Sequence, residues 1–314
     1  MKLLSILVPC YNEESVIEAF EEEMTEELQK LKAGWSYEIV FVNDGSKDGT
    51  LEFLKTFANR DERNKYISFS RNFGKEAAMV ASLHYCRGDC AVIIDADLQH
   101  PPALIHQMLD LYEKGYDQVI AKRTRTGDSR MGTFFAKTYY KIVNKIVEVQ
   151  MVDGAGDFRL LSRPAINAIK SLPESNRFSK GLYSWIGFNQ IYIEYENQQR
   201  AAGETKWSFR KLLKYGVEGV LSFNTEPLKL CIWMGGITIA LSLVYLICLL
   251  IRIIVMGIDV PGYFTTIFVV SMIGGVQLLS LGIIGEYVGK IYSEVKRRPP
   301  YIVKECNISN TKNE

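Results

Sequence analysis

The strongest structural signal in this chain is the segment Val92-Ile93-Ile94-Asp95-Ala96-Asp97-Leu98-Gln99-His100-Pro101-Pro102. A short apolar run rich in β-branched residues ends here in two carboxylates and a turn, which predicts a buried strand with an acidic carboxyl end. In open α/β sheets the carboxyl ends of the strands face the crevice where ligands bind. We therefore expect Asp95 and Asp97 to point into such a crevice.

The acidic pair also predicts a metal site. Two carboxylates this close in sequence repel each other unless a cation or a proton lies between them. Mg²⁺ and Mn²⁺ take oxygen ligands and usually share their coordination shell with substrate phosphates. We expect Mg²⁺ or Mn²⁺ at Asp97 and Asp95; a surface pair that caps the helix after Pro101 is the alternative interpretation.

Further strands are expected before this stretch, at residues 3–8, 38–43 and 65–70, and helical patterns separate them. This alternation predicts an α/β fold with a mostly parallel, doubly wound sheet. Each strand ends in a polar or glycine-bearing loop, and such loops gather at one edge of the sheet. That edge is predicted to bring together Tyr11, Glu13, Asp44, Lys75, Asp95 and Asp97.

Glycine-rich phosphate-binding motifs are missing from the sequence: it has neither G-x-G-x-x-G after the first strand nor G-x-x-x-x-G-K-[ST]. A nucleotide would have to be held differently. Asp44 could accept a hydrogen bond from a base, Tyr11 could pack against the base, and Lys75 could meet a phosphate oxygen. Taken singly, Asp44 also suits a turn former and Lys75 a solvated charge.

Composition limits the classes of function. The 314 residues carry a net charge of +1, which gives no sign of a nucleic-acid partner. The six cysteines form no C-x-x-C pair, and they are interpreted as free thiols in a reducing compartment. The apolar run at 3–8 is too short for a signal peptide, so the amino-terminal domain is expected to stay in the cytoplasm.

The carboxyl-terminal third predicts a membrane anchor. Leu230–Ile251 and Pro261–Gly285 lack charged residues and are long enough to span a bilayer. Basic residues lie before the first span and after the second, whereas only Arg252 lies between them, so both termini are expected in the cytoplasm of a two-span cell-membrane protein. Glycines in both spans suggest close helix contacts and a homo-oligomer.

The segment before the first span has an apolar stripe beside basic residues and Trp207, which is typical of an amphipathic helix in the headgroup region. Packing of that stripe on the preceding domain is the alternative. The expected organisation is a catalytic domain at 1–200, a juxtamembrane segment at 201–226, a two-helix hairpin at 227–289 and a cytoplasmic tail at 290–314. Residues 307–314 are polar and predicted to be disordered.

Four ordered segments resemble a known enzyme family: Pro9-x-Tyr11-Asn12-Glu13, Asp44-Gly45-Ser46-x-Asp48-Gly49-Thr50, Arg71-Asn72-x-Gly74-Lys75 and Asp95-Ala96-Asp97-Leu98-Gln99-x-Pro101. In order and spacing they resemble the family 2 inverting glycosyltransferases of GT-A fold. The resemblance is greatest to the polyprenyl-phosphate sugar transferases, which include dolichol-phosphate mannose synthases and bacterial undecaprenyl-phosphate sugar transferases. It covers nearly the whole chain, including the hydrophobic segments.

The resemblance implies a donor site and a metal site. Its residues would be Pro9, Tyr11, Asn12 and Glu13 around the nucleoside, Asp44 at the base, Lys75 as a further member, and Asp95 and Asp97 at the diphosphate. Asp97 would hold the divalent ion. The segment 152–160 resembles the Gly-x-Phe-Arg-Leu segment of the family, with Asp157 near the reaction centre; a structural pair of Asp157 with Arg159 is the alternative.

Basic residues are expected at the acceptor. Guanidinium groups match phosphate oxygens bidentately, which makes Arg123, Arg125 and Arg130 candidates for binding a lipid phosphate; a solvated basic loop is the alternative. Arg200 and Lys206 belong to a segment that resembles the juxtamembrane part of the family. A phosphate acceptor is already anionic, so Asp157 is expected to orient groups and not to abstract a proton.

Together these features predict inverting transfer of one sugar from a nucleotide sugar, UDP-glucose or UDP-N-acetylglucosamine, to a polyprenyl phosphate, undecaprenyl phosphate in a bacterium. A processive polysaccharide synthase is one alternative, but its Gln-x-x-Arg-Trp motif is missing from the sequence. A catalytically silent membrane scaffold of the same fold is the other. The three aspartates of the predicted site argue against it.

Overall fold

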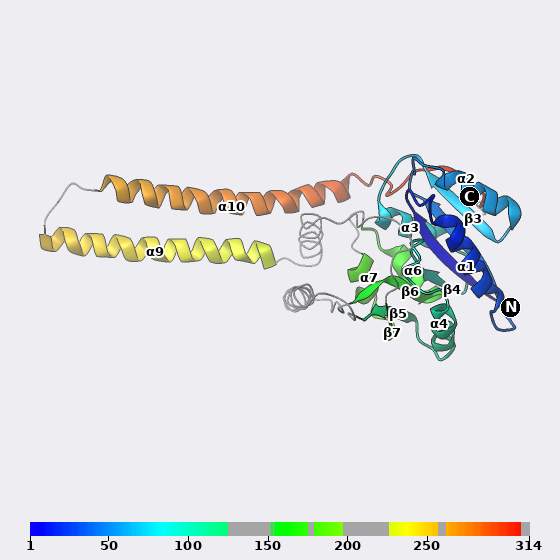
Figure 1. The fold of residues 1–314 in the computed structure, drawn as a ribbon. Helices are drawn as coiled ribbons and strands as arrows, with labels where there is room; N and C mark the ends of the chain where they lie inside the picture. Colours follow the sequence, from blue (N-terminus) through cyan, green and yellow to red (C-terminus); the bar gives the residue numbers. More distant parts are fainter. Residues whose placement is uncertain (125–151, 153, 175–178, 197–225, 257–261, 309–314) are drawn as a thin grey trace.

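A single β-sheet organises the amino-terminal part of the chain. The computed structural model describes residues 1–124, 152, 154–174, 179–196, 226–256 and 262–308. Within these residues, eight strands form one sheet in the order β7 (Gln190–Tyr195), β5 (Gln118–Arg123), β6 (Ala155–Ser162), β4 (Cys90–Ile93), β1 (Lys2–Cys10), β2 (Trp35–Asn43), β3 (Asn64–Phe69) and β8 (Val303–Cys306). Figure 1 shows helices on both faces of this sheet.

Helices cover each face because the central strands are apolar on both sides. In β2, Ile39 and Phe41 join one buried core and Val40 and Val42 the other, as the two-residue period of a strand requires. The first core includes residues of α1 (Ile17–Gln29), α2 (Thr50–Arg60) and α4 (Leu104–Glu113). The second includes residues of α3 (Lys75–Tyr85), α6 (Arg163–Ser171) and α7 (Ser179–Trp185).

Strand direction brings the predicted site residues to one edge. β4, β1, β2 and β3 are parallel neighbours, so their carboxyl ends meet there, and the prediction of a mostly parallel α/β sheet is confirmed. β6 runs antiparallel to both β4 and β5. Its first residues therefore lie at the edge where the parallel strands end, which is the edge expected to bind ligands.

Two loops at this edge are pressed against each other. Gly45, just after β2, has a φ of +64°. A Cβ atom there would lie 2.4 Å from the carbonyl carbon of Arg71 and 2.6 Å from the amide nitrogen of Asn72, in the loop after β3. Only glycine combines this left-handed backbone with so close an approach. The site loops are thus held by backbone packing.

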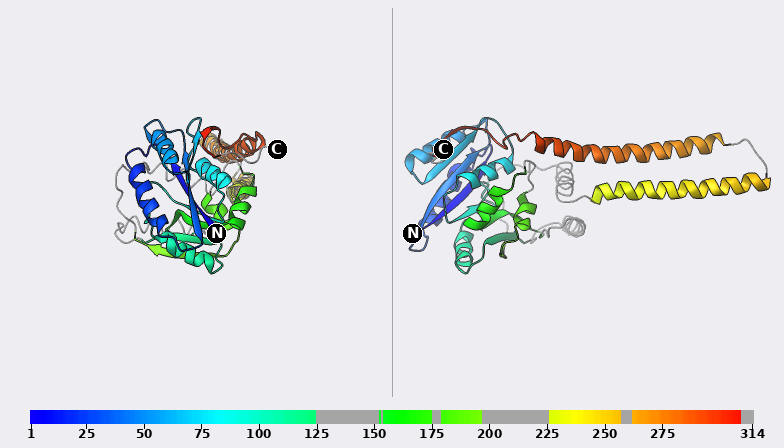
Figure 2. Two further views of the ribbon diagram at one scale, coloured as in Figure 1. Left: turned by 90° about the vertical axis from the view of Figure 1, so that its right-hand side faces the viewer. Right: turned by 180° about the vertical axis from the view of Figure 1, so that it is seen from behind.

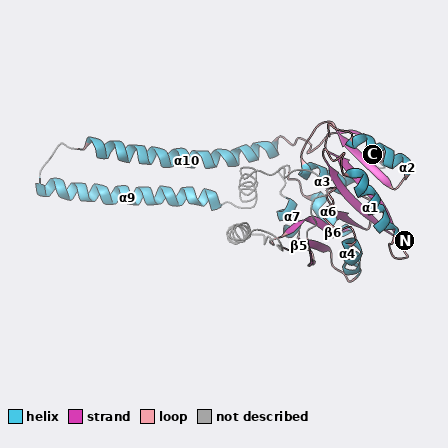
Figure 3. Cartoon of the chain, in the orientation of Figure 1, coloured by secondary structure: helices cyan, strands magenta, loops and turns pink. Residues whose placement is uncertain are grey.

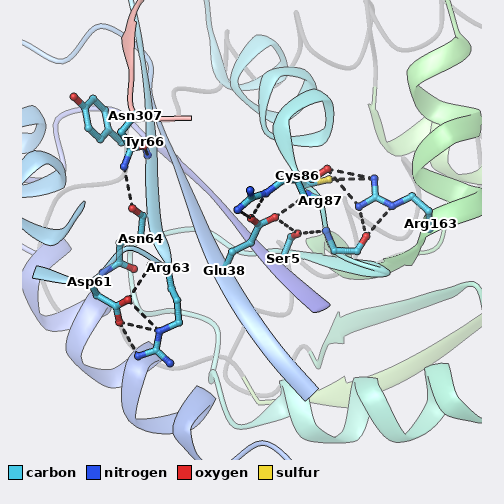
Figure 4. A network of polar contacts seen from close by, with 11 residues as sticks. Ser5, Glu38, Asp61, Arg63, Asn64, Tyr66, Cys86, Arg87, Arg163 and Asn307 are labelled. Carbon is cyan, nitrogen blue, oxygen red and sulfur yellow. Dashed lines mark hydrogen bonds and ion pairs between the residues drawn. The ribbon is translucent and has the colours of Figure 1, made fainter. Parts of the chain in front are cut away.

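A buried carboxylate stabilises the sheet nearer to the amino-terminal ends of its central strands. Glu38 of β2 is 2% exposed. It accepts hydrogen bonds from Ser5 Oγ at 2.7 Å and from the backbone amide of Arg87 at 2.7 Å, and it pairs with the Arg87 guanidinium at 3.0 Å (Figure 4). These partners satisfy the charge and join β1, β2 and the turn before β4.

Two long helices follow the α/β domain. α9 (Glu226–Met256) and α10 (Tyr263–Val295) lie side by side and extend away from the sheet (Figures 2 and 3). Among the described residues, one segment, Met272–Val295, is long and apolar enough to cross a membrane, and none of its most apolar window is buried. The expectation of two spans stays a prediction.

The carboxyl-terminal segment returns to the sheet, which the sequence did not predict. β8 pairs antiparallel with β3 and becomes the last strand of the sheet. Asn307, where a disordered tail was expected to begin, accepts a hydrogen bond from the Tyr66 amide at 2.7 Å and donates one to the Asn64 carbonyl at 3.1 Å. The prediction is therefore wrong for Asn307. Residues 309–314 lie outside the described residues, as does almost all of the juxtamembrane segment at 201–226.

Replacing Gly45 tests the packing of the two loops. We expect Gly45→Ala to lower the free energy of unfolding by about 2–4 kcal/mol, because the added methyl group overlaps the Arg71 backbone and the residue is left-handed. Gly34→Ala is the matched control, since Gly34 has a φ of +95° but no atom within 4 Å of the added Cβ. It should cost about 1 kcal/mol. Thermal and denaturant unfolding measure both; equal losses would contradict the packing argument.

Candidate active site

The centre of the site is a lysine between two aspartates. In the β4–β6 ladder Val92 lies opposite Leu160 and Ile93 opposite Arg159. Continuing this register by two residues places Asp95 opposite Asp157. Lys75, the first residue of α3, extends between them: its Nζ lies 2.7 Å from Asp95 Oδ1 and 2.7 Å from Asp157 Oδ2.

Electrostatics hold this lysine in its charged form. Burial alone would lower the pKa of Lys75, but the carboxylates of Asp95 and Asp157 raise it well above its ordinary value. The ammonium group therefore stays protonated at every physiological pH. Asp95, Asp157 and the Lys75 ammonium together carry a formal charge of −1, and Asp97 adds a further carboxylate two residues after Asp95. Such a cluster favours the arrival of a divalent cation.

Asp97 follows the strand in a tight turn. Its Oδ1 accepts a hydrogen bond from the Gln99 amide at 3.1 Å, and Leu98 between them has a φ of +57°. No group of three or more histidine, cysteine or acidic side chains within the described part of the chain is arranged to enclose a metal. Mg²⁺ and Mn²⁺ are commonly held by one or two carboxylates together with substrate phosphates, and Asp95 and Asp97 are two carboxylates at this sheet edge. The residues present thus suit the predicted ion.

His100 lies between Asp95 and Tyr195. Its Nε2 lies 3.9 Å from Asp95 Oδ2, and its Nδ1 lies 2.7 Å from the hydroxyl of Tyr195 at the end of β7. Burial raises the pKa of Tyr195 to about 12, so the phenol keeps its proton. Burial also lowers the pKa of His100, against the opposing effect of Asp95. A neutral imidazole that accepts a hydrogen bond from the Tyr195 hydroxyl at Nδ1 carries its own proton on Nε2, the nitrogen nearer to Asp95.

Asp44 is joined to the loop after β3. The side chain is buried, and its two oxygens accept hydrogen bonds from the amides of Phe73, at 2.6 Å, and Gly74, at 2.9 Å. Burial raises the pKa of Asp44, and these two amides lower it again in part. The carboxylate therefore fixes the backbone immediately before Lys75. Its predicted contact with a base stays a prediction.

The loop after β1 carries the other predicted donor residues. Pro9 lies in β1 beside Val42, and the half-buried Tyr11 and Glu13 follow the strand. The Asn12 amide donates to Ser46 Oγ at 3.0 Å, and Asn12 Oδ1 accepts from the Lys47 amide at 2.9 Å. Asn12 thus holds the first and second loops together, a structural task that its assignment to donor binding did not foresee.

Of the predicted acceptor residues, the structure places Arg123. It ends β5, opposite Tyr195 of β7, and its amide donates to the Gly154 carbonyl at 2.9 Å. Because β5 is antiparallel to β6, which is itself antiparallel to β4, Arg123 lies at the same sheet edge as Asp95. The other four predicted phosphate-binding residues lie outside the described residues: Arg125, Arg130, Arg200 and Lys206.

Behind Asp157 lies a buried cluster that sequence reasoning missed. Arg159 is 3% exposed, its guanidinium stacks 4.0 Å from the centre of the Tyr183 ring, and its Nη2 donates to the Gly156 carbonyl at 2.6 Å. Asp157 also acts electrostatically on Arg159, so the structural pair considered from sequence stays an alternative for Asp157. Glu76, beside Lys75, bonds to Ser179 of α7. Both interactions brace the backbone on either side of the lysine bridge.

Known proteins that are similar to this chain identify its family. Residues 5–170 match the family described as Glycosyl transferase family 2, and residues 226–291 match the GtrB C-terminal hairpin. CsbB of Bacillus subtilis (strain 168) is 52% identical over 308 residues, 98% of this chain and 93% of that protein. The chain belongs to glycosyltransferase family 2. The resemblance inferred from the four motifs is confirmed.

Relatives of this family 2 glycosyltransferase include proteins with a named acceptor. The SfII prophage-derived bactoprenol glucosyl transferase of Shigella flexneri is 40% identical over 308 residues, 98% of this chain and 99% of that protein. A prophage bactoprenol glucosyl transferase homolog of Escherichia coli (strain K12) is 38% identical over 302 residues, 96% of this chain and 98% of that protein. Both likenesses extend through the helical hairpin as well as the α/β domain.

The lysine bridge can be tested by a double-mutant cycle. Lys75→Met should lower the free energy of unfolding because Asp95 and Asp157 then face each other without a cation. Adding Asp157→Asn should regain about 1 kcal/mol, although the same change in the wild type is destabilising. Lys32→Met with Asp110→Asn, at an exposed ion pair, should couple less strongly. An equal cost of Asp157→Asn in both backgrounds would refute the bridge.

The depressed pKa of His100 predicts an acid-dependent loss of stability. The unfolded chain takes up a proton at His100 near pH 6.5, whereas the folded protein resists protonation there. Stability from this residue is thus complete above about pH 6.5 and declines as the pH falls. Between pH 7.5 and 5.5 the wild type should lose up to about 1 kcal/mol more than His100→Asn. Parallel pH profiles of the unfolding midpoint would contradict this.

Proposed function

We propose that this glycosyltransferase transfers a single sugar, with inversion, from UDP-glucose or UDP-N-acetylglucosamine to a polyprenyl phosphate, undecaprenyl phosphate in a bacterial cell. The observation that carries the proposal is the acidic cluster around Lys75, which lies at the sheet edge that binds ligands and has the residues to meet a metal–diphosphate group. The names of the bactoprenol glucosyl transferases support the lipid acceptor.

A divalent ion suits the donor side of this site. Asp97 and Asp95 would hold Mg²⁺ or Mn²⁺, which when bound stabilises negative charge on the departing nucleoside diphosphate. Lys75 keeps the Asp95 carboxylate in place and adds a fixed positive charge beside it. His100 Nε2 lies 3.9 Å from the same carboxylate. The chain thus orients the leaving group with preformed contacts.

The acceptor side has a different requirement. A polyprenyl phosphate is already an anion, so the site needs no strong base and mainly has to align the phosphate oxygen with the sugar carbon. Asp157, held by Lys75 and by the braced β6 backbone, is suited to orienting the sugar or the acceptor. Arg123 at the same sheet edge is suited to the lipid phosphate, because a guanidinium pairs with two phosphate oxygens.

The nucleoside would lie along the ends of β1 and β2. Pro9, Tyr11 and Glu13 line this part of the edge, and Asn12 and Asp44 fix the loops around it. Although two backbone amides already bond to Asp44, its carboxylate has lone pairs for a base N–H as well. These residues are proposed as the base and ribose contacts of the UDP-sugar.

The membrane arrangement is part of the proposal. α9 and α10 would cross the bilayer as a hairpin, with the catalytic domain and both termini in the cytoplasm, where nucleotide sugars occur. The match of residues 226–291 to the GtrB C-terminal hairpin supports this arrangement. Such an anchor would keep the catalytic domain beside the lipid headgroups, where the phosphate of the acceptor lies. The donor site would remain open to the water-soluble nucleotide sugar.

The decisive assay uses the purified full-length protein with labelled UDP-glucose, UDP-N-acetylglucosamine, UDP-galactose and GDP-mannose. Each is incubated with undecaprenyl phosphate and Mn²⁺ or Mg²⁺, and lipid-extractable label is measured. We expect one UDP-sugar to give a lipid carrying one sugar, and chelation to abolish the product. Label in a polymer would indicate a processive synthase, and no label with any donor would favour a silent scaffold.

Asp97→Asn tests the role of the acidic pair in the same assay. Loss of one carboxylate at the diphosphate should lower kcat by about a hundredfold or more, since preorganised charge at a leaving group contributes several kcal/mol. Asp110→Asn is the matched control, because this carboxylate lies on the exposed side of α4 and should leave kcat unchanged. Equal activity of the Asp97 and Asp110 variants would exclude the proposed metal site.

A further inference from the structure

The carboxyl-terminal strand β8 lies next to β3, the strand that leads into the donor-site loop. We use this name for residues 70–74, which connect β3 to Lys75 at the start of α3. α10 ends at Val295, and only seven residues separate it from β8, which pairs with β3. Beyond that ladder the Ser70 amide donates to the Ile302 carbonyl at 3.0 Å, and the Asn307 amide donates to the Tyr66 carbonyl at 3.2 Å. Figure 4 shows Asn307 beside Tyr66 and Asn64. The end of the anchor is therefore attached along all of β3.

Tyr301, just before β8, makes the contact that matters for the site. Its ring stacks on Phe69, the last residue of β3, with 5.0 Å between the ring centres and 11° between the planes. Its hydroxyl lies 3.0 Å from Nδ1 of His84 in the last turn of α3. One side chain thus joins the strand before the donor-site loop to the helix after it.

A row of contacts continues from Tyr301 to the lysine bridge. Phe69 packs edge-on against Phe73, with the ring centres 5.8 Å apart. The Phe73 amide donates to Asp44, as does that of Gly74, and the next residue is Lys75. Since aromatic rings in contact transmit displacement as rigid units, the position of Tyr301 constrains where α3 begins.

We propose that Tyr301 is a positioning residue for the sugar-transfer reaction: by packing behind residues 69–75 it sets the place of Lys75 between Asp95 and Asp157. The inference rests on the proposed function, because it assigns this loop to the donor site. The membrane anchor and the donor site then form one mechanical unit. Tyr301 then influences nucleotide affinity through the backbone of residues 69–75.

Three variants of the full-length protein test this role. Tyr301→Ala removes the stacked ring, Tyr301→Phe keeps the ring but removes the hydroxyl, and Lys304→Ala changes an exposed residue of the neighbouring strand β8. Hydrogen exchange of peptides spanning 69–75 is compared with that of peptides from β1 and β4. The dissociation constant of UDP is measured by calorimetry with Mn²⁺ present.

Tyr301→Ala should accelerate exchange at 69–75 while β1 and β4 exchange as in the wild type, and it should weaken UDP binding by about tenfold. Tyr301→Phe and Lys304→Ala should bind UDP within about twofold of the wild type, because both retain the stacked rings. The proposal would be overturned by unchanged exchange at 69–75 or by an exchange rate that rises uniformly across the sheet. Either result would indicate that β8 serves only to cover the edge strand β3.

A failure to fold is distinguished from a loss of positioning. If Tyr301→Ala does not give folded protein, Tyr301→Leu replaces it, since leucine retains apolar contact without the flat ring, and the same exchange criterion decides. If the wild type itself does not bind UDP, the proposed donor is wrong. The exchange pattern at 69–75 then supports or overturns the positioning role by itself, because that measurement needs no nucleotide.

Discussion

Repulsion between carboxylates is the constraint on which this structure depends. Asp95 lies two residues beyond β4 and Asp157 lies in the antiparallel neighbour β6, and Lys75 stabilises this arrangement by contacting both carboxylates at 2.7 Å. The lysine can do so only because α3 begins at that point. The loops before α3, held by Asp44 and by the close approach of Gly45, therefore serve the electrostatics of the site as much as the fold.

Much of this arrangement could be predicted from sequence, for a physical reason. Parallel strands place their carboxyl ends at one edge, so residues that follow buried apolar runs come to the same edge, as Asp44 after β2 and Asp95 after β4 do. Hydrophobic runs and the residues after them are local signals. The place of Asp157 came from resemblance to a family motif, since nothing local shows that β6 runs antiparallel and begins at the same edge.

Contacts that join distant parts of the chain could not be predicted in this way. His100 belongs to the acidic segment 92–102, yet its partner Tyr195 lies 95 residues away and becomes a neighbour only because β7 pairs with β5. β8 is four residues long, follows a 33-residue helix and has no clear alternation, so its sequence resembles a polar tail. Its stability comes from the open edge of β3 and from Tyr301, and neither is visible locally.

Under the proposed function, the return of the chain to β3 bears on how the enzyme aligns a lipid phosphate with a nucleotide sugar. A lipid phosphate is held at the depth of the headgroups, whereas a nucleotide sugar arrives from water, so the distance between donor site and bilayer must be constrained for in-line transfer. A catalytic domain joined to its anchor only through a linker would leave that distance variable. Here a second attachment, from α10 through Tyr301 to Phe69, ends directly behind the residues that carry Lys75. The loop that leads to Lys75 thus also receives the attachment of α10. The orientation of the catalytic domain relative to α10 and the position of Lys75 therefore depend on the same contacts.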